Sequence, residues 1–217
     1  MRSSISIGPS AMRDGGKGKA KRVSRDIIYV DNAATSYPKP PETLLAMRRF
    51  MEAVGGSPGR SGHRLSIAAA REVFAAREVL AGLFGVDDPL RIVLTKNATE
   101  ALNIAMLGLL RPGDHVVTSG MEHNSVMRPL RALEAAGVSL SVVPCSAAGE
   151  LDPGDVRKAI RTDTKAIVLT HASNVSGTIL PIAEAGALCR ERGIFFAVDA
   201  AQTAGHLPID MTQSNID

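Results

Sequence analysis

The sequence predicts an α/β fold in which helices cover both faces of a mostly parallel sheet. From about residue 90 onward, short apolar runs alternate with helical patterns, and polar turns separate them. Residues 92–95, 166–170 and 194–198 are apolar nearly throughout, which is typical of strands that are buried on both faces. Parallel strands need long crossover connections, which helices usually supply. These observations together favour a parallel sheet over an antiparallel one.

The chain before residue 91 is expected to contain two parts. Residues 1–25 are basic, rich in Ser and Gly, and without an apolar period, so they are expected to form a disordered basic leader. Residues 26–90 are expected to form an N-terminal segment of loops and one helix. Its Gly-Gly-Ser-Pro-Gly stretch predicts a loop over residues 55–63, and a helix over residues 66–84 follows, with Ser66 as its N-cap.

The remaining residues, 91–217, are predicted to form the sheet domain. Strands are predicted over residues 91–95, 115–119, 139–144, 165–170 and 194–198. Helices are predicted between them, near residues 98–110, 123–136, 153–161 and 181–192. Gly113 and Gly193 come after helical patterns, where a glycine commonly ends a helix or forms a turn.

Composition narrows the class of protein. With 217 residues, 45% of them hydrophobic, the chain can bury one sizeable core. The formal charge of +3 is modest, and the basic leader has no aromatic residue, so no nucleic-acid partner is expected. No run is apolar enough for a membrane span or a secretory signal. Cys145 and Cys189 lack metal-ligand spacing and suit a reducing compartment, so a cytoplasmic protein without a metal is expected.

Polar residues follow several of the predicted strands, and ligands of open α/β sheets bind at such carboxyl ends. Ala98 and Thr99 open a helix directly after a strand. The free backbone N–H groups there, the helix dipole and the Thr99 hydroxyl form a potential anion site, although a plain helix cap explains the same residues. No Gly-rich dinucleotide or P-loop motif follows any strand, which argues against an NAD- or ATP-binding domain.

Asp199 comes directly after a very apolar strand, so its carboxylate is expected to be buried. A buried carboxylate needs a cationic or strongly donating partner, and no Lys or Arg lies close by in sequence. This favours a cationic ligand, while a cap of the following turn is the alternative. His123 is either a cap or core residue or a ring-stacking group, and Asn174 and Gln202 are either turn residues or ligand contacts.

The motifs that contain these residues resemble the class V aminotransferases, which depend on pyridoxal 5′-phosphate (PLP) and have fold type I. The resemblance covers residues 27–217 and is greatest to the branch of cysteine desulfurases and selenocysteine lyases. The motifs are Asp31-Asn32-Ala33-Ala34-Thr35, Arg60-x-x-His63-x-Leu65-Ser66, residues 95–100, Glu122-His123-Asn124-Ser125, Asn174-x-x-Gly177 and Asp199-x-x-Gln202.

The resemblance implies a role for each site residue. Ala98 and Thr99 would bind the cofactor phosphate, and Asp199 would pair with the ring nitrogen. His123 would stack on the ring and act in proton transfer. Asn174 and Gln202 would also contact the cofactor and the substrate. The substrate pocket would be lined by Asn32, Ala33 and Ala34, and Arg60 and His63 would lie near its mouth.

The implied activity is that of a cysteine desulfurase, which converts L-cysteine to L-alanine and forms a persulfide on a cysteine thiolate. The resemblance also implies a homodimer when full length and allows for a protein that accepts the sulfur. Another enzyme of the same fold, such as a selenocysteine lyase, an aminotransferase or an epimerase, is the alternative within the class. A non-catalytic binding module is the alternative outside it.

The sequence departs from the family pattern after Asp199. Family members carry a Ser/Thr-x-His-Lys motif there, whose lysine binds the cofactor covalently, and this sequence reaches residue 217 without it. The small C-terminal domain of the family is also absent. Of the seven lysines, only Lys96 lies in a site loop, where a surface or phosphate-side role is expected, and both cysteines are expected to be packing residues. We therefore expect residues 91–217 to be a C-terminally truncated large domain and this chain alone to be inactive.

Overall fold

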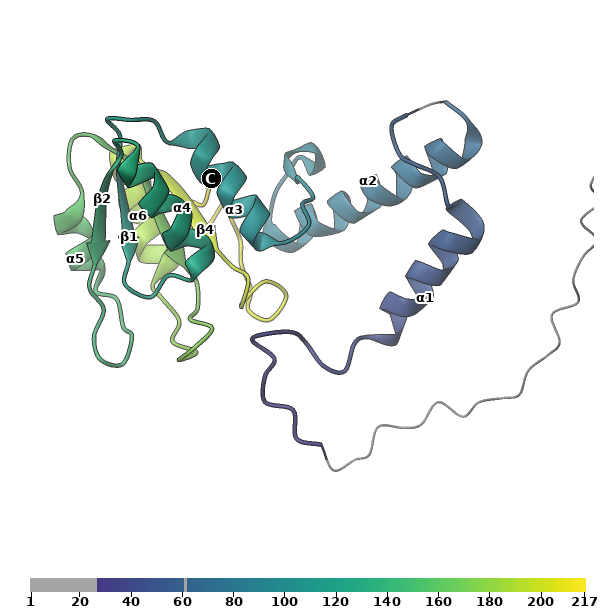
Figure 1. The fold of residues 1–217 in the computed structure, drawn as a ribbon, viewed down its shortest axis with the longest axis horizontal. Coiled ribbons are helices and arrows are strands. Elements are labelled where there is room, and N and C mark those ends of the chain that lie inside the picture. The colour runs from purple at the N-terminus through teal and green to yellow at the C-terminus, as the bar shows by residue number, and fades with distance from the viewer. Residues whose placement is uncertain (1–26, 61) are drawn as a thin grey trace, which may run out of the picture.

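The computed structural model describes residues 27–60 and 62–217, and its centre is a parallel sheet (Figure 1). The strands are β1 (His115–Ser119), β2 (Ser139–Val143), β3 (Thr164–Thr170) and β4 (Phe195–Asp199). Their order across the sheet is β2-β1-β3-β4, and every neighbouring pair is parallel. The predicted fold class is confirmed, and these four strands lie within one residue of their predicted bounds.

Helices connect the strands, as parallel pairing requires. The chain runs from α3 (Ala98–Leu109) into β1, and α4 (Asn124–Ala135), α5 (Pro153–Ala159) and α6 (Ile182–Arg192) supply the next three crossovers. Gly193 adopts φ 63° after α6 and donates its N–H to the Cys189 carbonyl, so it ends that helix as predicted. The predicted leader over residues 1–25 lies outside the described residues.

Two hydrophobic clusters lie on opposite faces of the sheet, because successive side chains of a strand point to opposite sides. On one face Val117, Ile167 and Phe196 pack with apolar side chains of α5 and α6. On the other face Val116 and Val168 pack with side chains of α3 and α4. Helices therefore cover both faces, which explains the long apolar runs in the sequences of β3 and β4.

The strand predicted over residues 91–95 is wrong. Pro89–Arg91 form a short 3-10 helix, and residues 92–95 are irregular, with Val93 71% and Leu94 47% exposed. A strand exists only where a neighbour completes its hydrogen-bond ladder. Within the described residues the sheet ends at β4, and no strand pairs with this segment. The apolar run is strand-like in sequence, but the partner that would make it a strand is not among these residues.

The N-terminal segment contains α1 (Pro41–Arg49), the π-helical turn η1 (Phe50–Val54) and the long helix α2 (Arg64–Phe84), which extends away from the sheet (Figure 1). Helix α1 was not predicted, although Pro41 at its start is a helix-start signal. Helix α2 begins before Ser66, which was the predicted N-cap. The cap is His63, whose Nδ1 accepts the Ser66 N–H at 3.2 Å. None of the described helices is long and apolar enough to cross a bilayer.

Candidate functional site

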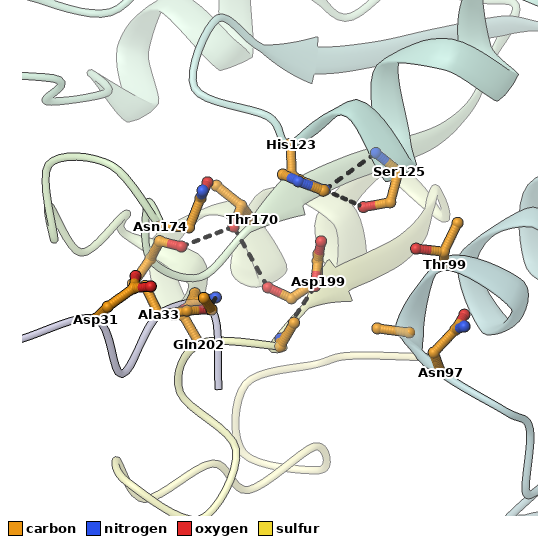
Figure 2. Close-up of a pocket in the computed structure, with 14 residues that line it drawn as sticks. Asp31, Ala33, Asn97, Thr99, His123, Ser125, Thr170, Asn174, Asp199 and Gln202 are labelled. Carbon is orange, nitrogen blue, oxygen red and sulfur yellow. Dashed lines mark hydrogen bonds between the residues drawn. The ribbon is translucent and has the colours of Figure 1, made fainter. Parts of the chain in front are cut away.

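One pocket of about 440 Å³ lies where the carboxyl ends of the strands meet (Figure 2). Thr170 ends β3, Asp199 ends β4, and His123 lies in the turn after β1. Thr99 and Asn97 lie at one end of the pocket, and Asn174, Ala33 and Gln202 lie at the other (Figure 2). The lining residues are Asp31, Ala33, Ala34, Asn97, Ala98, Thr99, His123, Ser125, Thr170, Ala172, Asn174, Asp199, Ala201 and Gln202.

The N-terminus of α3 points its free amides toward this pocket. Asn97 caps the helix, because its side-chain Oδ1 accepts the Glu100 N–H at 2.9 Å. Glu100 in turn accepts the Lys96 N–H at 2.8 Å. No hydrogen bond found in the described part of the chain uses the amides of Ala98 or Thr99. These two donors, with the helix dipole behind them, are available to an anion.

Asp199 presents a buried carboxylate. The residue is 6% exposed, and its Oδ1 accepts the Ala201 N–H at 3.0 Å. No Lys or Arg belongs to the pocket lining, so within the described residues this carboxylate has no cation across the cavity. Because a buried charge needs a partner, the pocket is complementary to a ligand with a cationic group near Asp199. The turn-cap alternative holds as well, since the Ala201 amide is the one that a turn cap would use.

His123 caps a helix and also lines the pocket, whereas its ring-stacking role stays a prediction. Its Nδ1 accepts the Ser125 N–H at 3.2 Å and lies 2.8 Å from the Ser125 Oγ, so the ring caps α4. A nitrogen that accepts an amide N–H carries no proton in the neutral ring, so the proton is on Nε2. The ring also lines the pocket and lies across it from Asp199 (Figure 2). The cap thus fixes both the orientation and the tautomer of this imidazole.

Gln202 connects the N-terminal segment to the sheet edge. Its Nε2 donates to the Ala33 carbonyl at 3.1 Å across 169 positions of sequence. This contact brings Asp31, Ala33 and Ala34 to the pocket opposite the N-terminus of α3. One amide hydrogen of Gln202 is used in this bond, and its second hydrogen and its carbonyl oxygen remain available to a ligand.

Three residues that the resemblance implied do not line this pocket. The Asn32 Oδ1 accepts the Tyr37 N–H at 3.2 Å, which stabilises the loop after residue 31. His63 caps α2, and Arg60 lies in the loop before that helix, at the end of α2 that is remote from the sheet (Figure 1). Their roles at the substrate side remain predictions.

The structure adds pocket residues that the sequence reasoning did not assign. Asp31 belongs to the same motif as Asn32, and Thr170 is the last residue of a correctly predicted strand, so strand-end position was a usable signal for it. Asn97 was recognisable as a helix cap from its place before Ala98. Ser125, Ala172 and Ala201 complete the set.

Glu122 is a partly exposed acid whose carboxyl group is shielded beside the pocket. Its Oε1 accepts the Ser119 Oγ–H at 2.6 Å and the Thr170 N–H at 2.9 Å. Burial raises the pKa of Glu122 to about 7. The negative charge of Asp199 also raises this pKa, whereas the two hydrogen bonds lower it. A substantial fraction of this carboxyl is therefore protonated at neutral pH.

No lysine or cysteine of residues 27–60 and 62–217 lines the pocket. Lys96 points to solvent with its side chain 85% exposed, 3.7 Å from Glu100. Cys189 is buried in the core beside the sheet, and burial raises its pKa to about 12. Burial also raises the pKa of Cys145, which packs against the same cluster. Neither thiol has the thiolate character that sulfur transfer requires. Across residues 27–60 and 62–217, no three His, Cys, Asp or Glu side chains gather to hold a metal ion.

Solved structures resemble this fold, and one of them is a cysteine desulfurase. The apo structure of cysteine desulfurase from Thermococcus onnurineus NA1 matches with a TM-score of 0.82 and 34% identity, over 88% of this chain and 48% of that one. A structure described as SspA in complex with cysteine matches with a TM-score of 0.81 and 32% identity, over 87% and 55% of the two chains.

Curated sequences agree with the structural likeness. A probable cysteine desulfurase from Methanothermobacter thermautotrophicus is 36% identical over 194 residues, which are 89% of this chain and 48% of the relative. Cysteine desulfurase IscS from Photorhabdus laumondii is 37% identical over 196 residues, with 88% and 48% covered. The chain thus spans about half the length of these relatives. The aminotransferase class-V family profile matches residues 28–217, so the chain belongs to the class-V aminotransferase family.

Proposed function

We propose that the protein is a PLP-dependent enzyme acting on amino acids, most specifically a cysteine desulfurase, and that this chain supplies the cofactor pocket. One observation carries the proposal. Among the described residues, no lysine or arginine lines the pocket that the buried Asp199 carboxylate faces, and no hydrogen bond uses the two amides of the same pocket at the N-terminus of α3. A ligand with a cationic ring nitrogen and a phosphate satisfies both features at once.

The residues present fit PLP. The amides of Ala98 and Thr99 and the Thr99 hydroxyl would hold its phosphate, and Asp199 would hold a proton at the ring nitrogen. His123 would lie against the ring, with its Nε2 proton directed by the cap on its Nδ1. Asn174 and Gln202 would bond the polar substituents at the far end of the pocket.

When bound, PLP supplies an electron sink for bonds at the Cα of an amino acid. The residues of the protein would orient the cofactor and hold protons at defined atoms. Asp199 keeps the ring nitrogen charged, because a buried carboxylate favours the protonated form of a neighbouring base. His123 would move a proton at Nε2 on the substrate side, since its Nδ1 is occupied by the Ser125 amide.

L-cysteine is proposed as the substrate because relatives with this fold are cysteine desulfurases and one matching structure contains cysteine. Persulfide formation needs a cysteine thiolate, and Cys145 and Cys189 lie outside the pocket with raised pKa values. The desulfurase proposal therefore requires a further cysteine, and a protein that accepts the sulfur from it. We also propose a cytoplasmic location, since both cysteines are free.

A homodimer is proposed as well. Large apolar side chains are exposed along α1, η1 and α2, namely Leu44, Leu45, Met47, Met51, Phe74 and Val79. Apolar surface of this extent commonly marks an interface. We expect the purified chain to elute as a dimer or larger species in size-exclusion chromatography with light scattering. A Leu44→Ser, Met51→Ser double variant is expected to shift it toward the monomer, whereas a monomeric parent chain would contradict the proposal.

Binding of PLP to the purified 217-residue chain tests the proposed function. Equilibrium dialysis is expected to give saturable binding of one PLP per chain. Because no lysine of the described part of the chain lines the pocket, borohydride reduction followed by peptide mass spectrometry is expected to trap no single lysine above the level of the others. Lys96→Arg is the matched control and should bind PLP as the parent chain does. Absence of saturable binding would overturn the proposal, and selective trapping on Lys96 would contradict the non-covalent prediction.

A further inference from the structure

Glu122 joins the carboxyl ends of two strands with a single oxygen. Its Oε1 accepts the Ser119 Oγ–H at 2.6 Å, at the end of β1, and the Thr170 N–H at 2.9 Å, at the end of β3. Thr170 lies 48 residues further along the chain. The contact is therefore a tertiary one, and no local turn requires it.

The two strand ends that Glu122 joins carry opposite sides of the pocket. His123 is the next residue after Glu122, and its ring caps α4. Thr170 is the β3 partner of Asp199 in the β3–β4 register, and the next residue donates its N–H to the Asp199 carbonyl at 2.9 Å. A shift of Glu122 would therefore move His123 and Asp199 relative to each other.

The second carboxyl oxygen of Glu122 takes no part in these hydrogen bonds. Oε2 is shielded from solvent and has no hydrogen-bond partner among the described residues. The groups around the carboxyl are the Ser119 hydroxyl from β1, the Thr170 amide from β3, the Asp199 carboxylate from β4 and the Cys145 thiol from the segment after β2. An ionised carboxyl with one unsolvated oxygen and a negative neighbour is unfavourable in such a place.

We propose that Glu122 is a positioning residue that sets His123 and Asp199 in place for the cofactor. It does so through the hydrogen bonds that its Oε1 accepts from the Ser119 hydroxyl and the Thr170 amide, and we call this pair of hydrogen bonds the Glu122 bracket. Burial raises the pKa of Glu122 to about 7, and because both hydrogen bonds favour the ionised carboxylate, the bracket is expected to hold at and above neutral pH. The inference rests on the proposed function, because PLP binding is one of its readouts.

The experiment compares the unsubstituted chain with Glu122→Gln and Glu122→Ala. Glutamine keeps an acceptor oxygen for Ser119 and Thr170 and cannot ionise, so it should bind PLP like the parent at pH 6. At pH 8.5 the ionised parent keeps both hydrogen bonds, so it should bind PLP at least as well as Glu122→Gln there. Glu122→Ala loses the bracket and should bind about tenfold more weakly at both pH values. Comparing the parent with each variant at the same pH removes the titration of PLP itself from the comparison.

Hydrogen exchange of the Thr170 amide gives a readout that does not depend on PLP. Protection of this amide should be lost in Glu122→Ala and retained in Glu122→Gln at pH 6. Parent and both variants binding PLP equally at both pH values would overturn the positioning role while leaving the proposed function intact. A parent chain that does not bind PLP overturns both. Unchanged Thr170 protection in Glu122→Ala would show that the bracket does not exist and would overturn the inference alone.

Discussion

Replacing Asp199 with asparagine is expected to weaken PLP binding by about tenfold to a hundredfold. A buried opposite charge shifts the pKa of its partner by roughly 1–3 units, and one unit corresponds to a tenfold change in affinity of the charged form. The asparagine side chain has nearly the shape of the native one and keeps an acceptor for the Ala201 amide, so the loop after β4 should be retained. The loss should come from the charge alone. Equilibrium dialysis of the 217-residue chain at neutral pH measures it.

Comparing PLP with pyridoxal, which lacks the phosphate, separates the two ends of the pocket. Asp199→Asn should weaken both ligands, because both have the ring nitrogen. Thr99→Ala should weaken PLP alone, because its hydroxyl and the α3 N-terminus face the phosphate in the proposed orientation. Nitrogen NMR of labelled ligand should also show the ring nitrogen losing its proton at lower pH in Asp199→Asn. If Asp199→Asn binds both ligands as the parent does, the ring nitrogen does not face Asp199.

The sheet was predictable because a strand that is buried on both faces has a continuous run of apolar residues in its sequence. β3 and β4 are largely apolar, and the helical patterns between the predicted strands left parallel pairing as the consistent solution. The same signal gave a wrong prediction at residues 91–95. An apolar run indicates that a segment tends to be buried, but it does not identify the strand with which the segment would pair. Strand identity there depends on tertiary pairing, which local sequence does not encode.

The pocket was predictable to the extent that it consists of strand ends. Parallel strands place their carboxyl ends at one edge, so His123, Asn174 and Asp199 had to converge once the fold class was known. Thr99 joins them although the residues before its helix, 92–95, form no strand. Residues outside the sheet followed no such rule. Asp31 reaches the pocket through the bond between Gln202 and the Ala33 carbonyl, 169 positions apart, and only a three-dimensional structure reveals that contact. Arg60 lies just before α2, at the end of this helix that is remote from the sheet (Figure 1). The spacing of apolar residues in α2 predicts a helix but does not predict the direction in which the helix extends.

Replacing Gly186 with alanine is expected to destabilise the fold by about 3 kcal/mol. Gly186 lies inside α6, and a Cβ there would come 1.9 Å from the Ser214 carbonyl oxygen and 3.4 Å from the ring of Phe196. Both neighbours are constrained, since Phe196 is fully buried in β4 and its carbonyl accepts the Asp217 N–H at 3.0 Å. The helix or the chain around Ser214 must move, and either shift opens the core beside the strand that ends in Asp199.

Gly108→Ala in α3 is the matched control for this prediction. It makes the same chemical change in a helix, but apart from its chain neighbours and the nearby backbone of its own helix, no described heavy atom lies within 4 Å of the added Cβ. Alanine is the better helix former, so this variant should be more stable than the parent by about 0.5–1 kcal/mol. Urea denaturation followed by circular dichroism gives both free energies of unfolding. Equal changes in the free energy of unfolding would show that α6 does not pack closely against residue 214. Changes of opposite sign would show that this contact fixes the distance between α6 and β4, and therefore the position of the Asp199 carboxylate.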